Sequence, residues 1–377
     1  MESDNTGPSP EENALETAIQ ARLDSLDSGN YRANNELVLA QFAIFLRDKR
    51  DVTSLEDLTV LDCRRYAQWL RTRVNDDGDD LSAASAHANG PYFTIVRAFL
   101  SWCVDDERLD TNPARPNRVK QALPEYHADH DRQFWSADAR KALLNFVDKR
   151  AHDTLDQFDD TRERAFRDRA IVTMLALTGA RGAELFHDPR DDHRNGIRWR
   201  NLDLENGVAL VFGKTREEQA IPLTKRVVDG LESYHRVLDP ATSDWPVFPT
   251  RHHPSLATAV RDGLQDRGWT EDDIAATFEE STSMELLREH ELAPPALSKN
   301  GARSLMQRLC EEASIEIDGE YLKPHGGRRG LGSELYAVDA ELAQETLRHE
   351  SIETTHESYR KQSVAERKKR LEDILDE

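Results

Sequence analysis

One run near the end of the chain does most to decide the fold: residues 348–359 read RHESIETTHESY and end in Tyr359. Two upstream stretches accompany it, TGARGAEL at residues 178–185 and HGGR at residues 325–328. Among their residues are a phenol, the two arginines Arg181 and Arg328, and the two histidines His325 and His349, drawn from segments far apart in the sequence. A fold that brings them together would assemble the groups needed to attack a phosphodiester without a metal ion.

These residue types suit phosphoryl transfer. Arg181 and Arg328 stay charged at neutral pH and can each bind phosphate through two N–H groups. A tyrosine hydroxyl has an ordinary pKa of about 10, so Tyr359 needs a neighbour that removes its proton or stabilises its anion. His325 and His349 titrate in the useful range and could serve. Tyr359 is therefore the candidate nucleophile.

The leaving oxygen of a cleaved phosphodiester also needs a proton. Residues 211–223 read VFGKTREEQAIPL and place Lys214 between two strand-like segments, at the expected tip of a β-hairpin. An ammonium group at such a tip can reach into a neighbouring site. Lys214 is therefore the candidate general acid.

The order and spacing of these motifs resemble those of the tyrosine recombinases, the phage-integrase and Xer-like superfamily. In that family an arginine in a T-G-x-R-x-x-E-L context, a hairpin lysine, an H-x-x-R pair, a further His or Trp and a terminal tyrosine act together. The resemblance implies cleavage of DNA through a 3′-phosphotyrosyl intermediate, with neither metal nor cofactor, by four protomers on two double-stranded DNA sites. It implies six catalytic residues: Arg181, Lys214, His325, Arg328, His349 and Tyr359.

The chain departs from the family pattern at three positions. Arg348 stands where the family usually has a glycine before the histidine, and Tyr359 falls one residue later than usual. Gly327 replaces the usual leucine before Arg328, which is expected to loosen the packing beneath that arginine. None of the three removes a catalytic group. Glu184, in the first motif, is expected to orient a neighbour or to serve as a helix residue rather than act as a base.

Two other functions use the same features. A type IB topoisomerase-like enzyme would perform the same chemistry without pairing two DNA sites. A catalytically inactive, architectural DNA-binding protein would bind DNA and never form a covalent adduct.

The composition is unusual for a DNA-binding enzyme. The 377 residues include 71 Asp and Glu against 50 Lys and Arg, a net charge of −21. Self-repulsion of this size is tolerated best where salt screens it, since the Debye length falls to about 3 Å in 1 M salt. The balance favours a halophilic protein of haloarchaeal type, with an acidic mesophilic protein as the alternative.

The helical and strand patterns predict a mainly α fold with a small antiparallel β-sheet. Residues 1–10 read as a disordered tail, and residues 11–112 as a small helical bundle. The family resemblance implies that this bundle is a (SAM-like) core-binding domain that clamps DNA; a dimerisation or generic helical module is the alternative. Residues 113–132 contain three prolines and read as a linker, followed by an α+β catalytic domain over 133–377. Within it, strands are expected at 197–204, 208–212 and 220–223, and an acidic helical insertion at about 255–293.

Basic residues in an acidic chain mark where DNA phosphates could bind. Residues 113–122 read PARPNRVKQA, with three basic residues and no acid. Arg115, Arg118 and Lys120 are the candidates there, and Arg329 is open between supporting Arg328 and contacting the DNA backbone. An amphipathic helix is expected at 364–375, where the family resemblance implies docking on a neighbouring protomer.

The cysteines, the N-terminus and the apolar runs indicate the cellular location. Cys63, Cys103 and Cys310 are isolated, which excludes a disulfide framework and a cysteine zinc site. The N-terminus is polar and acidic, and no apolar run approaches the ~18 residues of a membrane span. These features predict a cytoplasmic protein without a membrane segment or a bound metal.

Overall fold

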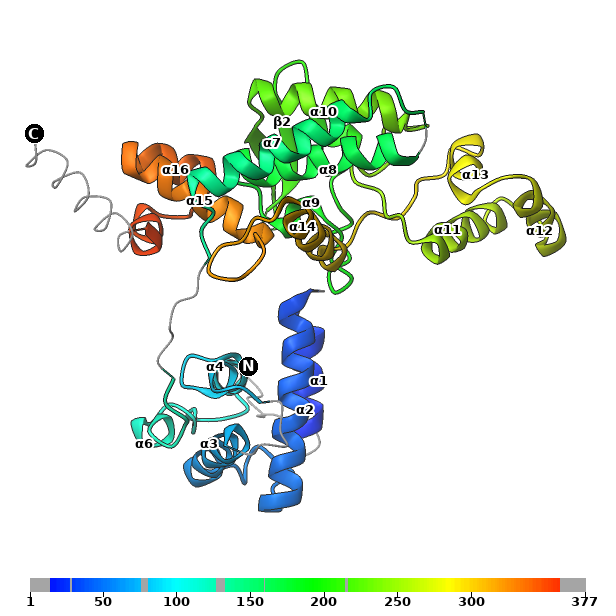
Figure 1. Cartoon of the computed structure of the whole chain (residues 1–377). Helices are drawn as coiled ribbons and strands as arrows, with labels where there is room; N and C mark the ends of the chain where they lie inside the picture. Colours follow the sequence, from blue (N-terminus) through cyan, green and yellow to red (C-terminus); the bar gives the residue numbers. More distant parts are fainter. Residues whose placement is uncertain are drawn as a thin grey trace, which may run out of the picture. The chain divides into compact units, whose positions relative to one another are not determined.

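The computed structural model describes residues 14–27, 29–75, 81–126, 133–158, 160–213 and 216–359. The chain divides into two compact units, Met1–His130 and Asp131–Glu377, and each has its own hydrophobic core. Both units are mainly helical, and the second carries a three-stranded antiparallel sheet, which confirms the predicted fold class (Figure 1). The predicted tail at 1–10 and the terminal helix at 364–375 lie outside the described residues.

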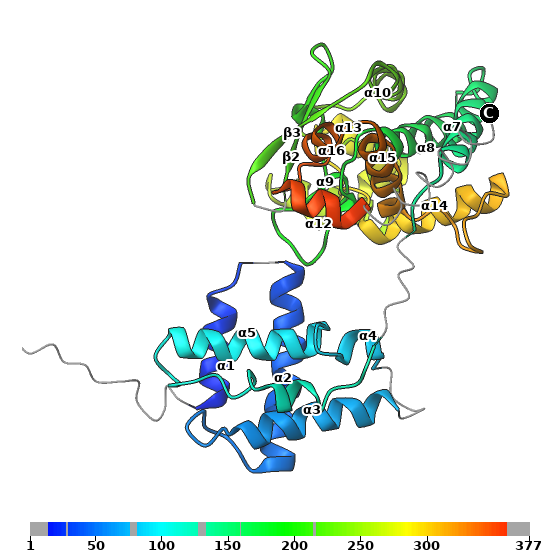
Figure 2. The same ribbon diagram turned by 90° about the vertical axis from the view of Figure 1, so that its left-hand side faces the viewer.

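The N-terminal unit is a helical bundle. Its helices α2, α3 and α5 pack on one another, and Figure 2 shows α3 and α5 lying across α2. Phe42, Tyr66 and Phe99 are among the side chains fully buried between them. The described helices of this unit are α1 (Leu15–Asp24), α2 (Asn30–Arg50), α3 (Val60–Val74), α4 (Ala83–Ala86), α5 (Pro91–Asp105) and α6 (Asn117–Lys120).

Helix α3 begins as its sequence predicts. The Thr59 side chain accepts a hydrogen bond from the backbone N–H of Asp62, and the backbone N–H of Thr59 donates to the Asp62 carboxylate at 3.0 Å. This reciprocal capping box satisfies two backbone donors that the first turn leaves open.

The segment expected to be a linker differs from that expectation in its first half. Ala114, Val119 and Leu123 are buried in the core of the N-terminal unit, and α6 packs against α3. The prolines here therefore shape a packed turn rather than an open connection, because apolar residues between them are buried. Part of the remaining connection lies outside the described residues.

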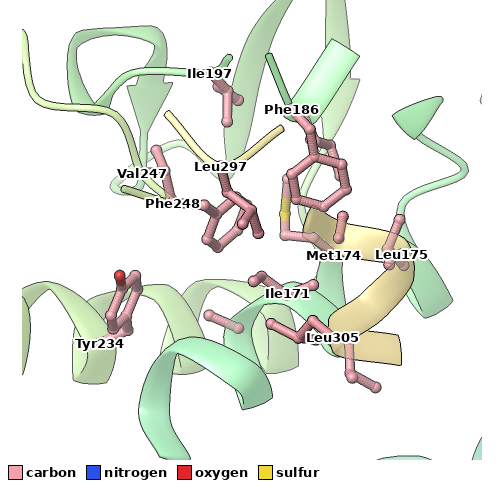
Figure 3. Close-up of a cluster of buried hydrophobic side chains, with 14 of the residues drawn as sticks. Ile171, Met174, Leu175, Phe186, Ile197, Tyr234, Val247, Phe248, Leu297 and Leu305 are labelled. Carbon is pink, nitrogen blue, oxygen red and sulfur yellow. The ribbon is translucent and has the colours of Figure 1, made fainter. Parts of the chain in front are cut away.

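The C-terminal unit is built around α8. Nearly every residue in the second half of this helix is buried, and α7, α10 and α15 pack against it. Figure 3 shows Ile171 and Met174 of α8 facing Phe248 and other apolar side chains. The helices of this unit are α7 (Ala137–Asp153), α8 (Asp160–Leu177), α9 (Gly182–Leu185), α10 (Lys225–Leu238), α11 (His253–Gln265), α12 (Glu271–Glu280), α13 (Ser283–Glu289), α14 (Lys299–Ala313), α15 (Pro324–Val338) and α16 (Ala340–Leu347).

The sheet has the order β1-β2-β3, with β1 at Leu202–Asp203, β2 at Val208–Phe212 and β3 at Glu218–Pro222. In the β2–β3 hairpin, Val208 pairs with Pro222 and Phe212 with Glu218, so the turn that contains Lys214 follows directly. The prediction of a strand from residue 197 was wrong over its first five residues. The Asn201 side chain accepts from the backbone N–H of Arg198 at 3.1 Å and caps a 3₁₀ turn there.

The acidic segment 255–293 folds into α11, α12 and α13. Helix α11 packs against α12 and α13, Arg288 of α13 donates to the Leu238 carbonyl oxygen at the end of α10, and Figure 1 shows the three helices projecting from the rest of the unit. Val260, Ile274 and Leu287 are buried among them. The ten acidic and three basic residues of this segment lie outside that small core or on its edge.

The HGGR motif lies in the first turns of α15 rather than in a loop or turn. The helix tolerates its glycines because other backbone comes very close to them. A Cβ on Gly327 would lie 2.5 Å from the Leu175 carbonyl oxygen, and one on Gly330 would lie 2.3 Å from the Trp135 carbonyl oxygen. The expectation that Gly327 loosens packing beneath Arg328 was wrong, since the glycine permits a closer approach of α15 to α8.

In the described part of the chain, no helix combines the length and apolar character that crossing a bilayer requires.

Candidate active site

Arg181 is held at the start of a short helix. Gly179 adopts a left-handed φ of 65°, which ends α8 and turns the chain so that Arg181 becomes the N-cap residue of α9. The Arg181 backbone N–H donates to Glu184 Oε2 at 2.7 Å, and its Nη1 donates to Glu184 Oε1 at 2.8 Å. The arginine side chain remains 24% exposed, so its other nitrogens can meet a ligand.

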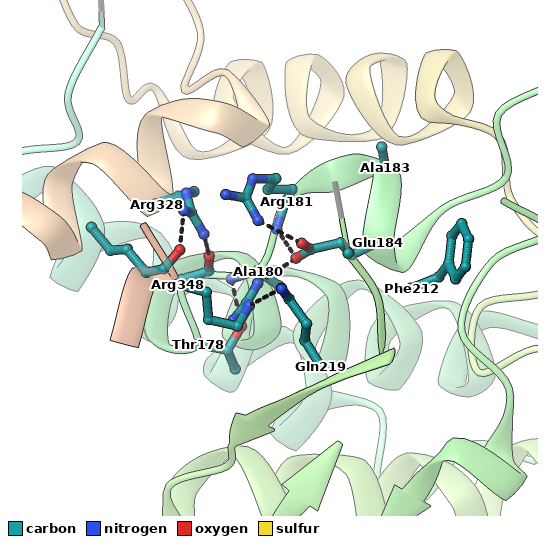
Figure 4. A network of polar contacts seen from close by, with 12 residues as sticks. Thr178, Ala180, Arg181, Ala183, Glu184, Phe212, Gln219, Arg328 and Arg348 are labelled. Carbon is teal, nitrogen blue, oxygen red and sulfur yellow. Dashed lines mark hydrogen bonds and ion pairs between the residues drawn. The ribbon is translucent and has the colours of Figure 1, made fainter. Parts of the chain in front are cut away.

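Arg328 reaches the same place from the second turn of α15. It is 3% exposed, and its two terminal nitrogens donate to the carbonyl oxygens of Gly179 and Leu347 (Figure 4). Burial, reinforced by repulsion from Arg181, lowers the pKa of Arg328 to about 9. A buried cation beside a second cation is stabilised by any anion that enters between them. The pair is therefore suited to binding a phosphate.

His349 and Tyr359 lie side by side at the end of the described chain. Their rings stack with centroids 6.2 Å apart, and His349 Nδ1 lies 2.8 Å from the Thr355 hydroxyl. Burial first, then the nearby Arg328 and Arg181, lowers the pKa of His349 to about 4. The imidazole is consequently neutral at physiological pH. In the tautomer in which Nδ1 accepts from the Thr355 hydroxyl, Nε2 carries the hydrogen and can donate it to a phosphate oxygen.

Tyr359 is buried, at 3% exposure. A Cβ placed on Gly332 would lie 2.2 Å from the Tyr359 hydroxyl oxygen, so the phenol rests against the α15 backbone. Burial raises the pKa of this hydroxyl, while the charges of Arg328 and Arg329 lower it in part. In this arrangement the phenol is protonated and its hydroxyl lies against Gly332.

The two remaining predicted catalytic residues are His325 and Lys214. His325 is exposed in the first turn of α15, three residues before Arg328 and therefore on the same side of the helix. Lys214 lies outside the described residues. Its flanking backbone is described: the Gly213 N–H donates to the Glu217 carbonyl oxygen at 2.8 Å, which closes the hairpin around it.

Sequence reasoning missed two arginines that hold this site together. Arg194 donates to the carbonyl oxygens of Ala183 at 3.0 Å and of Phe212 at 3.2 Å, and its Nη2 donates to the Gly213 carbonyl oxygen at 2.9 Å. These bonds connect helix α9 to the hairpin, which they reach at Gly213, the residue before Lys214. The charged run DPRDDHR at 188–194, between the first motif and the sheet, was the available signal.

Arg348 is the second missed residue. Sequence analysis noted it only as a departure from glycine, yet its Nη2 donates to Glu184 Oε2 at 2.6 Å. The Glu184 side chain is fully buried and accepts from both Arg181 and Arg348, which keeps the pKa of its carboxyl low against the effect of burial. This agrees with the expectation that Glu184 orients a neighbour.

The predicted DNA-binding residues lie in both units. Arg115 and Arg118 are exposed around α6 and Lys120 is half-buried there, while Arg329 is half-buried on α15. Arg115 lies at a cavity of about 710 Å³ that Asp105 and Asp110 also line, so the charge of this region is mixed. Within the described ranges no group of three His, Cys, Asp or Glu side chains could hold a metal ion.

The C-terminal unit matches a known family. The phage integrase family matches residues 145–366, which is more than half of the chain and includes all six predicted catalytic residues. The chain belongs to the phage integrase family.

Two relatives in this family are named tyrosine recombinase XerC. The one from Pelobacter propionicus is 26% identical over 215 residues, covering 56% of this chain and 58% of its own length. The one from Xanthomonas axonopodis pv. citri is 25% identical over 161 residues, covering 42% and 43% respectively. The chain therefore spans about half the length of these two relatives.

Solved structures share the fold with little sequence identity. The Tn1549 transposon integrase in complex with transposon right end DNA has a TM-score of 0.57 at 14% identity, covering 95% of this chain and 99% of that chain. The recombinase XerH bound to a palindromic difH substrate has a TM-score of 0.56 at 13% identity, covering 99% and 97%. These likenesses establish a phage-integrase fold.

Proposed function

We propose that this protein is a site-specific DNA recombinase that cleaves and rejoins DNA through a 3′-phosphotyrosyl intermediate. Tyr359 attacks the scissile phosphate, and the bond from phosphorus to the 5′ oxygen breaks. Arg181 and Arg328 hold the non-bridging oxygens, whose charge grows in the transition state. His349 donates a hydrogen bond to the same phosphate.

Two proton transfers complete the step. The phenol of Tyr359 loses its proton as it bonds to phosphorus, and His325 assists that transfer. Lys214 gives a proton to the leaving 5′ oxygen, which departs as a hydroxyl. The phosphotyrosyl bond keeps the energy of the broken phosphodiester, so a second 5′ hydroxyl can attack it and rejoin DNA without ATP.

One observation carries this proposal: Arg181, Arg328, His349 and Tyr359 come from distant segments yet lie in one small site. Arg328 donates to the carbonyl oxygens of Gly179, two residues before Arg181, and of Leu347, two residues before His349, whose ring stacks on Tyr359. Glu184 offsets only part of the charge of these arginines, so a phosphate bound beside them would stabilise the site further. The family and the named relatives support the same reading.

Double-stranded DNA is the partner in this proposal. The Tn1549 integrase and XerH structures are described as DNA complexes, and Arg115, Arg118, Lys120 and Arg329 would contact the backbone phosphates. Residues 11–112 would serve as the core-binding domain, one jaw around the duplex, with 133–377 as the catalytic domain. Four protomers would assemble on two DNA sites.

The cellular setting is proposed from composition. A net charge of −21 with only 11 lysines among the 50 basic residues suits a halophilic, haloarchaeal-type cytoplasm, where high salt screens the repulsion between acidic residues.

A covalent-capture experiment tests the function. The protein is mixed with a pool of nicked duplexes of random sequence, and covalent complexes are isolated under denaturing conditions and sequenced. The captured site is then cloned twice into one supercoiled plasmid. Deletion of the DNA between the two copies is expected for a recombinase.

The rival functions give other results in the same experiment. Relaxation of the plasmid without deletion would assign a type IB topoisomerase-like activity. DNA binding without any covalent complex would assign an architectural protein, and either result would overturn the proposal.

A further inference from the structure

Arg348 occupies a backbone conformation that normally calls for glycine. It follows the last residue of α16 with φ 51° and ψ 53°, in the left-handed region. Its N–H donates to the Glu345 carbonyl oxygen at 3.0 Å, and the His349 N–H donates to the Gln344 carbonyl oxygen at 3.1 Å. This pair of bonds is a Schellman motif, where a side chain other than glycine is strained. An arginine at this position therefore carries backbone strain that a glycine would not.

The side chain of Arg348 makes contacts that glycine could not. It is 10% exposed, and its Nη2 donates to Glu184 Oε2 at 2.6 Å. Its Nε donates to Gln219 Oε1 at 3.3 Å, on strand β3. Figure 4 shows the guanidinium between these two acceptors, with Arg181 on the far side of Glu184.

These contacts connect Arg348 to three residues of the proposed active site. The first is Arg181, which bonds to Glu184. The second is Lys214, because Gln219 packs against Gly213, the residue before it: a Cβ on Gly213 would lie 2.7 Å from the Gln219 amide. The third is Arg328, which donates to the carbonyl oxygen of Leu347, the residue before Arg348.

Charge makes the link to Glu184 specific. The buried carboxylate attracts the nearest guanidinium groups, and a single arginine could bind both of its oxygens in a bidentate pair. With a second guanidinium on Glu184 Oε2, the Arg181 side chain bonds Glu184 through Nη1 to Oε1 and remains 24% exposed.

We propose that Arg348 is a positioning residue that shares Glu184 with Arg181, so that Arg181 stays available to phosphate, and that braces the Lys214 hairpin through Gln219. This inference rests on the proposed recombinase function. Arg348 itself need not touch the DNA.

Arg348→Gly tests the proposal, because it separates stability from activity. Glycine relieves the left-handed strain, which offsets part of the stability lost with the ion pair to Glu184, so the variant should melt close to the wild-type temperature. Cleavage of a nicked suicide duplex should nevertheless slow by about 10- to 100-fold, the usual effect of small displacements in an active site. Ser314→Gly is the matched control: Ser314 ends α14 with φ 54° and should gain stability without any change in cleavage.

Three further measurements exclude a general structural effect. Arg348→Asn, which also tolerates the left-handed region, should show the same loss of cleavage. A substrate with sulfur at the leaving 5′ position should restore part of the rate, because part of the loss acts through Lys214. In a Glu184→Gln background, adding Arg348→Gly should slow cleavage less than it does in the wild type.

The results distinguish a failure of the positioning role from a failure of the recombinase function. Wild-type cleavage by Arg348→Gly, or a loss of cleavage matched by a lower melting temperature in both variants, would overturn the positioning role alone. Absence of any covalent complex with the wild-type protein would instead overturn the recombinase function.

Discussion

At the scale of single residues, the candidate site keeps its reactive groups in unfavourable surroundings. Arg328 is a buried cation, His349 is a histidine that resists protonation, and Tyr359 is a buried phenol. Each of these would be stabilised, or released, by a phosphate entering the site.

The pKa of His349 predicts a pH dependence of stability. The folded-state pKa of about 4 lies below the ordinary value of 6.5, so between these values the unfolded chain binds a proton that the folded site refuses. Stability from this group is complete above pH 6.5 and falls as the pH drops through the window. The melting temperature of the wild type should therefore fall more between pH 7.5 and 5.5 than that of His349→Gln. Equal falls in the two proteins would contradict the assignment.

A substitution at Gly332 tests the contact between helix α15 and the Tyr359 hydroxyl. Gly332→Ala places a methyl group 2.2 Å from the tyrosine oxygen and should destabilise the protein by about 1–3 kcal/mol, as overpacking usually does. Gly230→Ala in α10 is the control, since no atom lies within 4 Å of a Cβ there. That variant should be stabilised by about 0.5–1 kcal/mol, because alanine favours helix. Thermal melting compares them, and similar shifts would show that Tyr359 does not rest on Gly332.

Single residues also show what the sequence could and could not reveal. That Arg181, Arg328, His349 and Tyr359 lie close together could be expected from the order of the motifs, while their catalytic roles stay a prediction. The bond of Arg348 to Glu184 could not, since it joins residues 164 apart and depends on a left-handed turn that no periodicity marks.

At the scale of elements, the β2–β3 hairpin is fixed by a segment outside it. Arg194 holds the carbonyl oxygens of Phe212 and Gly213, and Asp191 accepts from Arg194 at 3.3 Å. Strand alternation predicted this hairpin correctly, but failed at residues 197–201, where Asn201 caps a 3₁₀ turn instead. The packing of the HGGR glycines against Trp135 and α8 is a tertiary contact, which the sequence alone does not reveal.

The hairpin supports a prediction about Lys214. Lys214→Ala should cleave ordinary DNA about 10²- to 10⁴-fold more slowly, the usual effect of losing general acid catalysis. Replacing the leaving 5′ oxygen by sulfur removes the need for a proton, so most of the loss should disappear. Equal losses on both substrates would assign Lys214 to phosphate binding.

Arg194→Ala should show the same pattern in weaker form, about 10- to 100-fold, because it misplaces the lysine without removing it. Arg200→Ala is the matched control: it removes an arginine from an exposed ion pair with Asp244, which contributes little. A loss that sulfur fails to restore in Arg194→Ala would separate Arg194 from the hairpin.

At the scale of the whole molecule, charge sets the conditions under which the protein works. With a net charge of −21, the acidic residues of the protein repel one another and repel DNA at low salt. Phosphate contacts ordinarily weaken as salt rises, with a log–log slope of about −0.9 per contact. Here the acidic surface should make that slope shallow, since salt also screens the repulsion.

Melting temperature and covalent-complex yield should therefore both rise between about 0.1 M and 2 M KCl, as the Debye length shrinks from about 10 Å to below 3 Å. A titration of both quantities against KCl checks this. Activity that peaks near ~0.1 M and disappears by about 1 M would refute the halophilic proposal and leave the recombinase proposal standing.

The most direct test of the central claim removes one oxygen atom. Tyr359→Phe keeps the ring that packs on His349 and Phe134, so folding and DNA affinity should stay close to those of the wild type. The measurement is the yield of covalent protein–DNA complex on a nicked suicide substrate under denaturing conditions. We predict a covalent complex with the wild type and none with Tyr359→Phe; a complex formed by the variant would show that another residue is the nucleophile.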